Sequence, residues 1–127
     1  MYIRTSYPKY DFTENAEKGA RVGIHNSDNQ RLSAEIVDYK GPPKNPILPS
    51  GERGREVANV EFSEPMAIQV IVQISIHEGE EDADIWIAKE KNGEWVWIRL
   101  VTSFVYDRQG KYLEARLMAS DPPIAVG

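Results

Sequence analysis

The segment Met66-Ala67-Ile68-Gln69-Val70-Ile71-Val72-Gln73-Ile74-Ser75-Ile76-His77 decides the fold class of this chain. Every second residue from Ile68 to Ile76 is a branched aliphatic residue, and most of the residues between them are polar. Because side chains alternate across a β-strand, this period of two predicts a long strand with one apolar face. We expect the apolar face to lie in the core; its residues are Ile68, Val70, Val72, Ile74 and Ile76.

Three shorter alternations predict further strands; they are Ala20, Val22 and Ile24, then Leu32, Ala34 and Ile36, then Ala58, Val60 and Phe62. No window has good helical periodicity, and the best helical candidate is a turn or two from Thr13 to Lys18. The sequence therefore predicts an all-β fold, an antiparallel β-sandwich or jelly-roll-like barrel of six to eight strands with a C-terminal meander.

Length and composition indicate one domain over residues 1–127. The chain has no cysteine, which excludes disulfide scaffolds, thiolate metal sites and cysteine nucleophiles. No apolar run is long enough for a membrane helix, and the first residues do not resemble a signal peptide. We therefore expect a soluble, cytoplasmic protein with no membrane partner.

The Asn92-Gly93 pair predicts a two-residue hairpin turn, because both residues tolerate positive φ. This turn sets a register in which Glu90 faces Trp95, and Ala88 faces Trp97. A weaker turn signal at Gln109-Gly110 predicts a second hairpin, and the two hairpins are expected to share one long middle strand.

The same register places the three tryptophans on one face of the sheet, together with Arg99. The residues expected on the opposite, core-facing side are Val96, Ile98, Leu100, Thr102, Phe104 and Tyr106. The face formed by Trp86, Trp95 and Trp97 has three interpretations: internal packing, an interface with a protein or another subunit, or a platform on which a sugar ring stacks.

Residues 40–54 contain four prolines and three glycines and therefore predict a long loop or an extended arm. The apolar pair Ile47-Leu48 lies between two of the prolines. We expect this arm to contact a neighbouring subunit, and the alternative is a lid that covers its own sheet. A stiff, proline-rich segment loses less entropy when it docks.

The chain carries a net charge of −5, which arises from one acidic stretch at residues 77–84. The acidic residues of this stretch are weak calcium candidates because calcium binds oxygen ligands; they are Glu78, Glu80, Glu81, Asp82 and Asp84. No cluster of lysine and arginine suits phosphate, so nucleic acid is not an expected partner.

Only His25 and His77 could serve as imidazole bases or ligands. His25, Ser27 and Asp28 are the residue types of a catalytic triad, but the run Asn26-Ser27-Asp28-Asn29 predicts a hairpin turn. The metalloprotease pattern His-Glu-x-x-His is absent, as are the glycine-rich phosphate-binding loops. The sequence therefore predicts no catalytic residues and no cofactor.

Three C-terminal stretches resemble the last strands of PAS sensor domains; they are residues 92–97, 107–111 and 118–121. That family places several helices before these strands, whereas residues 32–76 here predict strands and a proline loop. The resemblance therefore assigns no binding residues to this chain.

These observations predict a non-enzymatic binding or assembly protein that acts as a homo-oligomer. The surfaces expected to carry this function are the aromatic sheet face and the proline-rich arm, with Trp86, Trp95, Trp97, Arg99, Ile47 and Leu48. A protein or a glycan is a further possible partner. The alternatives are a carbohydrate-binding module with a tryptophan platform and a small enzyme with a histidine-dependent site.

Overall fold

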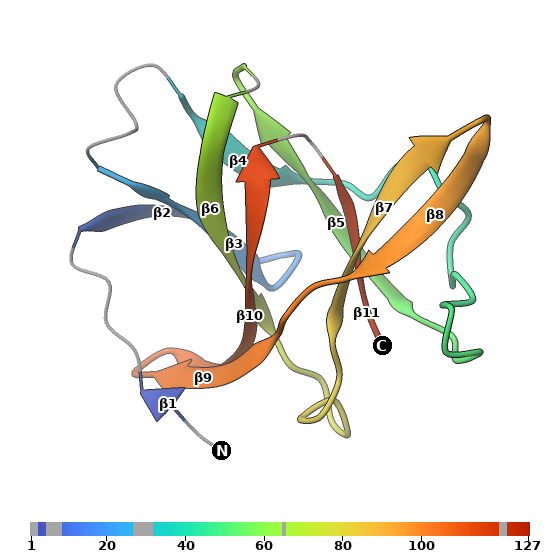
Figure 1. Ribbon diagram of the computed structural model, residues 1–127. Helices are drawn as coiled ribbons and strands as arrows, with labels where there is room; N and C mark the ends of the chain where they lie inside the picture. The colour runs from blue at the N-terminus through green and yellow to red at the C-terminus, as the bar shows by residue number, and fades with distance from the viewer. Residues whose placement is uncertain (1–2, 5–8, 27–31, 65, 120–121) are drawn as a thin grey trace.

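The computed structural model describes residues 3–4, 9–26, 32–64, 66–119 and 122–127 and confirms the predicted all-β fold. Two sheets pack face to face as a β-sandwich (Figure 1). One sheet has six strands, in the order β1 (Ile3–Arg4), β9 (Ser103–Asp107), β10 (Gly110–Ala119), β6 (Met66–Ser75), β3 (Ala20–His25) and β2 (Tyr10–Asn15). The other has five, in the order β4 (Ala34–Val37), β5 (Arg55–Phe62), β11 (Pro123–Val126), β7 (Ile85–Lys91) and β8 (Glu94–Arg99).

The core lies between the sheets, and β6 contributes to it as predicted. Val70, Val72 and Ile74 are fully buried, and Ile68 and Ile76 pack at its margin. Strand β6 lies between β3 and β10, so it is hydrogen-bonded on both edges. The five-stranded sheet supplies the opposing layer, with Val60, Ile85, Ile87, Ile124 and Val126 among its buried residues.

The described residues form eleven strands, more than the six to eight predicted. The helical turn expected from Thr13 to Lys18 is absent. Thr13 belongs to β2, and a tight turn follows in which the Lys18 backbone N–H donates to Asn15 Oδ1 at 3.2 Å. Strand β2 lacked an apolar alternation because it is an edge strand whose aromatic residues, Tyr10 and Phe12, face away from the core.

The Asn92-Gly93 turn forms as predicted. Asn92 has φ of 53° and Gly93 has φ of 79°, the values expected for the two central residues of a type I′ turn. The predicted register is also confirmed, since Trp86 pairs with Arg99 and Ala88 with Trp97. The second turn lies one residue earlier than predicted: Asp107 pairs with Gly110, so Gly110 begins β10.

The two hairpins do not share one long middle strand. Strand β8 belongs to the five-stranded sheet and β9 to the six-stranded sheet, so the chain crosses between them at residues 100–102. At this point Thr102 Oγ1 accepts a hydrogen bond from the Ile85 backbone N–H at 2.9 Å. The Ile85 N–H therefore bonds to a side chain and not to a backbone carbonyl of the neighbouring strand, and the backbone ladder between β7 and β8 ends at this point.

This crossing divides the face that the sequence predicted to be core. Leu100 and Phe104 pack against the core, whereas Val96 is 41% exposed and Ile98 is 39% exposed. Tyr106 also remains exposed. Strand β8 is the last strand of its sheet, and Figure 1 shows the β7–β8 hairpin projecting from one side of the sandwich.

The proline-rich loop lies over its own sheet. Leu48 is only 2% exposed, and a Cβ built on Gly127 would lie 2.5 Å from Leu48 Cδ1. The Leu48 backbone N–H donates to the Glu52 carbonyl at 2.8 Å, and Ile47 pairs with Arg53. The prediction that Leu48 reaches a neighbouring subunit is therefore wrong, because a local turn directs it onto its own C-terminus. Ile47 is 65% exposed.

Candidate binding surface

The three tryptophans share the outer face of the β7–β8 hairpin, as the register predicted, but they differ in accessibility. Trp86 is buried, and its Nε1–H donates to the Gly127 carbonyl at 3.0 Å. Its strand partner Ala125 is also fully buried. Trp86 is therefore a packing residue, and the accessible aromatic surface reduces to Trp95 and Trp97.

Trp95 and Trp97 are half-buried on the edge strand β8. The Trp95 ring lies beside Gly41 of the proline-rich loop, where a Cβ would come within 2.8 Å of Trp95 Cζ2. Gly41 also has φ of +106°, which an L side chain rarely adopts. Gly41 thus allows the loop to pass close to the ring while part of the ring stays open.

A groove of about 540 Å³ runs beside Trp95. Its polar lining includes Lys40, Asn59, Lys89 and Glu90. Asn59 is buried, and its Oδ1 accepts a hydrogen bond from the Lys40 backbone N–H at 3.0 Å. An aromatic ring flanked by amide and charged groups is an arrangement that can bind the apolar face and the hydroxyls of a sugar.

The inner side of the hairpin carries the exposed apolar residues. Val96 and Ile98 lie on the core side but remain substantially exposed; Val101, beyond the end of β8, is 93% exposed. Each residue of β8 from Trp95 to Ile98 is apolar, so this strand presents apolar side chains on both faces.

The edge of β8 is also open along its backbone. The Leu100 N–H donates to the Ile85 carbonyl, and hydrogen-bonded pairs alternate along an antiparallel ladder. Val96 and Ile98 therefore direct their backbone groups toward β7. The N–H and C=O groups of Trp95, Trp97 and Arg99 point away from β7, where no described strand pairs with them.

On the side of the sandwich away from β8, the edge strands of the two sheets, β2 and β4, are joined by side-chain contacts. Asn15 Nδ2 at the end of β2 donates to the Ile36 carbonyl of β4 at 2.8 Å. Lys18 and Asp38 form an ion pair at 2.6 Å across the same seam. These contacts connect edge strands of the two sheets to each other, and β8 has no such contact among the residues that the structure describes.

The acidic segment makes a structural ion pair. Arg55 donates to both carboxylate oxygens of Glu80 at 2.8 Å, and the His77 backbone N–H donates to Glu80 Oε1 at 2.8 Å. Burial of Glu80 raises its pKa, but the hydrogen bonds from Arg55 and His77 outweigh burial and hold the pKa below its ordinary value. Glu80 therefore fixes this loop to β5.

The remaining calcium candidates do not gather around Glu80. Glu78, Glu81 and Asp82 are exposed, and Asp84 Oδ2 lies 3.9 Å from Arg99 Nη1. No three His, Cys, Asp or Glu side chains within the described part of the chain are close enough together to hold a metal ion. The geometry gives the calcium prediction no support.

The histidines lie toward opposite ends of the six-stranded sheet. His25 ends β3 and packs edge-on against Tyr10, with ring centroids 5.1 Å apart. His77 follows β6 and is exposed. The register of β3 against β6 separates the two residues, so they do not form one site. Ser27 and Asp28 lie outside the described residues.

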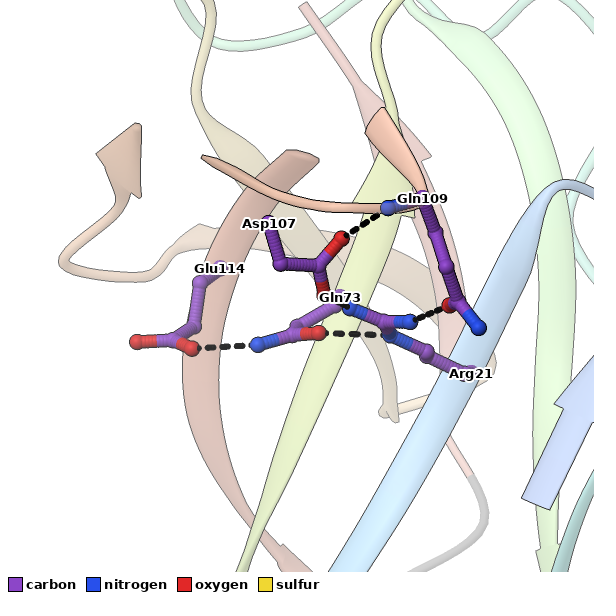
Figure 2. A network of polar contacts seen from close by, with 5 residues as sticks. All are labelled: Arg21, Gln73, Asp107, Gln109 and Glu114. Atoms are coloured by element: carbon purple, nitrogen blue, oxygen red, sulfur yellow. Dashed lines mark hydrogen bonds and ion pairs between the residues drawn. The ribbon is translucent and has the colours of Figure 1, made fainter. Parts of the chain in front are cut away.

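The outer face of the six-stranded sheet holds a polar cluster that sequence reasoning missed (Figure 2). Arg21 is 9% exposed and donates from Nε to Gln73 Oε1 at 2.6 Å. Its Nη2 donates to Asp107 Oδ2 at 2.5 Å, and its Nη1 donates to Gln109 Oε1. Gln73 links Arg21 to Glu114, because its Nε2 donates to Glu114 Oε1 at 2.7 Å.

Aromatic rings and hydrogen bonds stabilise the charges of this cluster. Arg21 Cζ lies 4.1 Å from the ring centroid of Tyr112 and 5.5 Å from that of Phe12, so the guanidinium makes cation–π contacts. Burial raises the pKa of Asp107, but hydrogen bonds from Arg21 and from the backbone N–H groups of Gln109 and Gly110 outweigh burial and lower that pKa.

The cluster is built to hold strands together. All three donor nitrogens of Arg21 have partners, and the lowered pKa of Asp107 means that these contacts stabilise its ionised form. A pocket of about 420 Å³ beside the cluster includes Arg21, Gln109 and Tyr112 in its lining, and each of the three guanidinium nitrogens already donates to a partner within the cluster. The available sequence signals were Arg21 and Gln73, which lie at outward positions of otherwise apolar strands.

Comparisons with protein-family models, curated proteins and solved structures returned no match for this chain. The part of the chain that the structure describes contains no helix, so none is present that could span a membrane.

Proposed function

We propose that this protein is a non-enzymatic binding protein that assembles into homo-oligomers through the β7–β8 hairpin. The observation that carries the proposal is the open edge of β8, with apolar residues on both faces. Native proteins protect edge strands with lysine, proline, bulges or covering segments. Strand β8 contains no lysine, proline or glycine and carries charge only at its two ends, Glu94 and Arg99, so its four central residues form an apolar edge; this favours a covered edge in the working form of the protein.

Light scattering on a sizing column tests this proposal. The expected mass lies above the 14.4 kDa of the monomer. Ile98→Lys places a charge on the apolar side of β8 and should reduce the mass to that of a monomer. Met118→Lys is the matched control, because Met118 is similarly exposed but belongs to the other sheet.

Both variants should retain the β-rich circular dichroism of the parent, since both positions are exposed at the surface. A parent protein that is monomeric over the whole accessible concentration range would contradict the proposal. An oligomer that survives Ile98→Lys and dissociates with Met118→Lys would show that the interface lies on the six-stranded sheet, which would also contradict the proposal.

The groove beside Trp95 supports a second candidate function, carbohydrate binding. Its aromatic wall and polar lining fit a sugar ring. Titration with glycans should quench tryptophan fluorescence in the parent. Trp95→Ala should remove the response and Trp97→Ala should retain it, because the lining of this groove includes Trp95 but not Trp97.

A further inference from the structure

We infer that the occupant of the β8 edge is the β8 strand of a second copy, paired antiparallel about a two-fold axis at Trp97. This inference rests on the proposed function and specifies its geometry. It would join the five-stranded sheets of two copies into one continuous sheet. Such an interface is self-complementary, as a two-fold interface requires.

The charges of β8 select the antiparallel direction. The strand begins with Glu94 and ends with Arg99. Antiparallel pairing places the Glu94 end of each copy beside the Arg99 end of the other and so keeps like charges at opposite ends of the interface, with the Glu94 and Arg99 side chains on opposite faces of the sheet. Parallel pairing would bring like charges together, which costs free energy in a sheet.

Backbone direction restricts the register further. The N–H and C=O groups that point outward from β8 belong to Trp95, Trp97 and Arg99. In an antiparallel ladder, residues directly opposite each other must both direct these groups toward the partner strand, or both away from it. Odd-numbered residues of one copy must therefore face odd-numbered residues of the other, and even must face even.

One of the permitted registers pairs every outward-facing residue. When Trp97 of one copy lies opposite Trp97 of the second, Trp95 faces Arg99 of the second copy and Val96 faces Ile98 of the second copy. The guanidinium then reaches a tryptophan ring across the strands, a favourable cation–π geometry. Val96 and Ile98, which are exposed in one copy, cover each other on the inner side. A shift of two residues would instead place either Arg99 opposite Gly93, which belongs to the turn, or Trp95 opposite Val101, which lies beyond the end of β8.

Engineered disulfides test this register without interference, because the chain has no cysteine. Val96→Cys and Ile98→Cys are made separately, then mixed and oxidised gently. Opposite residues that are not hydrogen-bonded have Cα atoms about 4.5 Å apart, within the range that a disulfide spans. Diagonal neighbours lie about 7–8 Å apart and fall outside it. A disulfide-linked dimer should form in the mixture, from the pairs that contain one copy of each variant, and should not form in either variant alone.

The outcomes separate this inference from the proposed function. A disulfide-linked dimer of Val96→Cys alone would overturn the register. Oligomers that form no disulfide in any combination would overturn edge pairing and leave assembly standing. A monomeric parent would overturn both.

Hydrogen exchange of the unaltered protein provides an independent check that does not depend on the variants folding. The amide hydrogens of Trp95, Trp97 and Arg99 should become protected as concentration rises through the assembly range. Those of Val96 and Ile98 already bond to β7 and should be protected at every concentration. Unprotected amides at Trp95 and Trp97 in the oligomer would overturn the inference.

Discussion

Arg21 shows how a single buried charge can be accommodated in a sheet of apolar strands. Taking a guanidinium out of water is costly unless it is paired and hydrogen-bonded. Here the cost is offset by Gln73, Asp107 and Gln109, and by the faces of Tyr112 and Phe12. Because these partners lie on different strands and on the β9–β10 turn, the side chain connects parts of the sheet that are far apart in sequence.

Asp107→Asn should therefore destabilise the fold at neutral pH. The change removes the negative partner of Arg21 and weakens a hydrogen bond to a charged group, for an expected loss of about 1–3 kcal/mol in the free energy of unfolding. Chemical denaturation at pH 7 would measure this loss. Asp82→Asn, at an exposed position of the acidic segment, is the control and should change stability by less than about 0.5 kcal/mol.

The same variant predicts a pH dependence. The pKa of Asp107 is lower in the folded protein than its ordinary value near 3.8. The unfolded chain therefore takes up the proton first, and the stabilising contribution of Asp107 is lost as pH falls through its folded-state pKa. The difference in stability between the parent and Asp107→Asn should shrink as pH decreases below about 4. A constant difference down to pH 2 would contradict this role for the carboxylate.

At the scale of elements, the strongest local signals correctly predicted one strand face and one turn. The alternation in residues 66–77 correctly predicted the core face of β6, and Asn92-Gly93 correctly predicted the register of β7 and β8. Both depend on neighbouring residues alone. The path of residues 100–102 depends on which sheet each hairpin joins, and that choice is made by long-range packing. No local pattern marks it, so the continuous middle strand was a natural but wrong prediction.

Gly93→Val tests the contribution of the turn. A β-branched residue at φ of 79° is strained, and no neighbouring atom lies within 4 Å to account for the effect sterically. We expect a loss of stability of about 1–3 kcal/mol and a weaker β7–β8 hairpin, measured by thermal unfolding and by exchange of the Val96 amide. Gly93→Asn should lose much less, because asparagine tolerates this conformation. Equal losses in the two variants would show that the turn conformation is not the cause.

At the scale of the whole molecule, the structure divides the predicted binding surface into a covered part and an open part. Sequence reasoning correctly placed Trp86, Trp95 and Trp97 on one face but could not show that the C-terminus covers Trp86. It also could not distinguish an arm from a lid, because both require the same apolar residues in a stiff loop. The distinction depends on Leu48 meeting Gly127, a contact between residues far apart in sequence.

The two neighbouring residues of the loop should therefore behave differently when replaced. Leu48→Ser removes a side chain that is 2% exposed and places a hydroxyl among apolar groups, so we expect a loss of roughly 2–4 kcal/mol in the free energy of unfolding. Ile47→Ser changes a residue that is 65% exposed and should alter stability by less than about 0.5 kcal/mol. Denaturant unfolding of the two variants, compared with the parent, measures the contrast.

Tryptophan emission would show whether the effect of Leu48→Ser reaches the sheet below the loop. Leu48 and Trp86 both lie against Gly127, which contacts the leucine side chain and accepts the indole hydrogen bond. Loosening the loop should free this terminus and shift the emission to longer wavelength under native conditions. Ile47→Ser should leave the emission unchanged, because that side chain points to solvent. If Leu48→Ser unfolds with the stability and emission of the parent, the loop does not act as a lid in solution, and an arm that reaches a second copy becomes the better description.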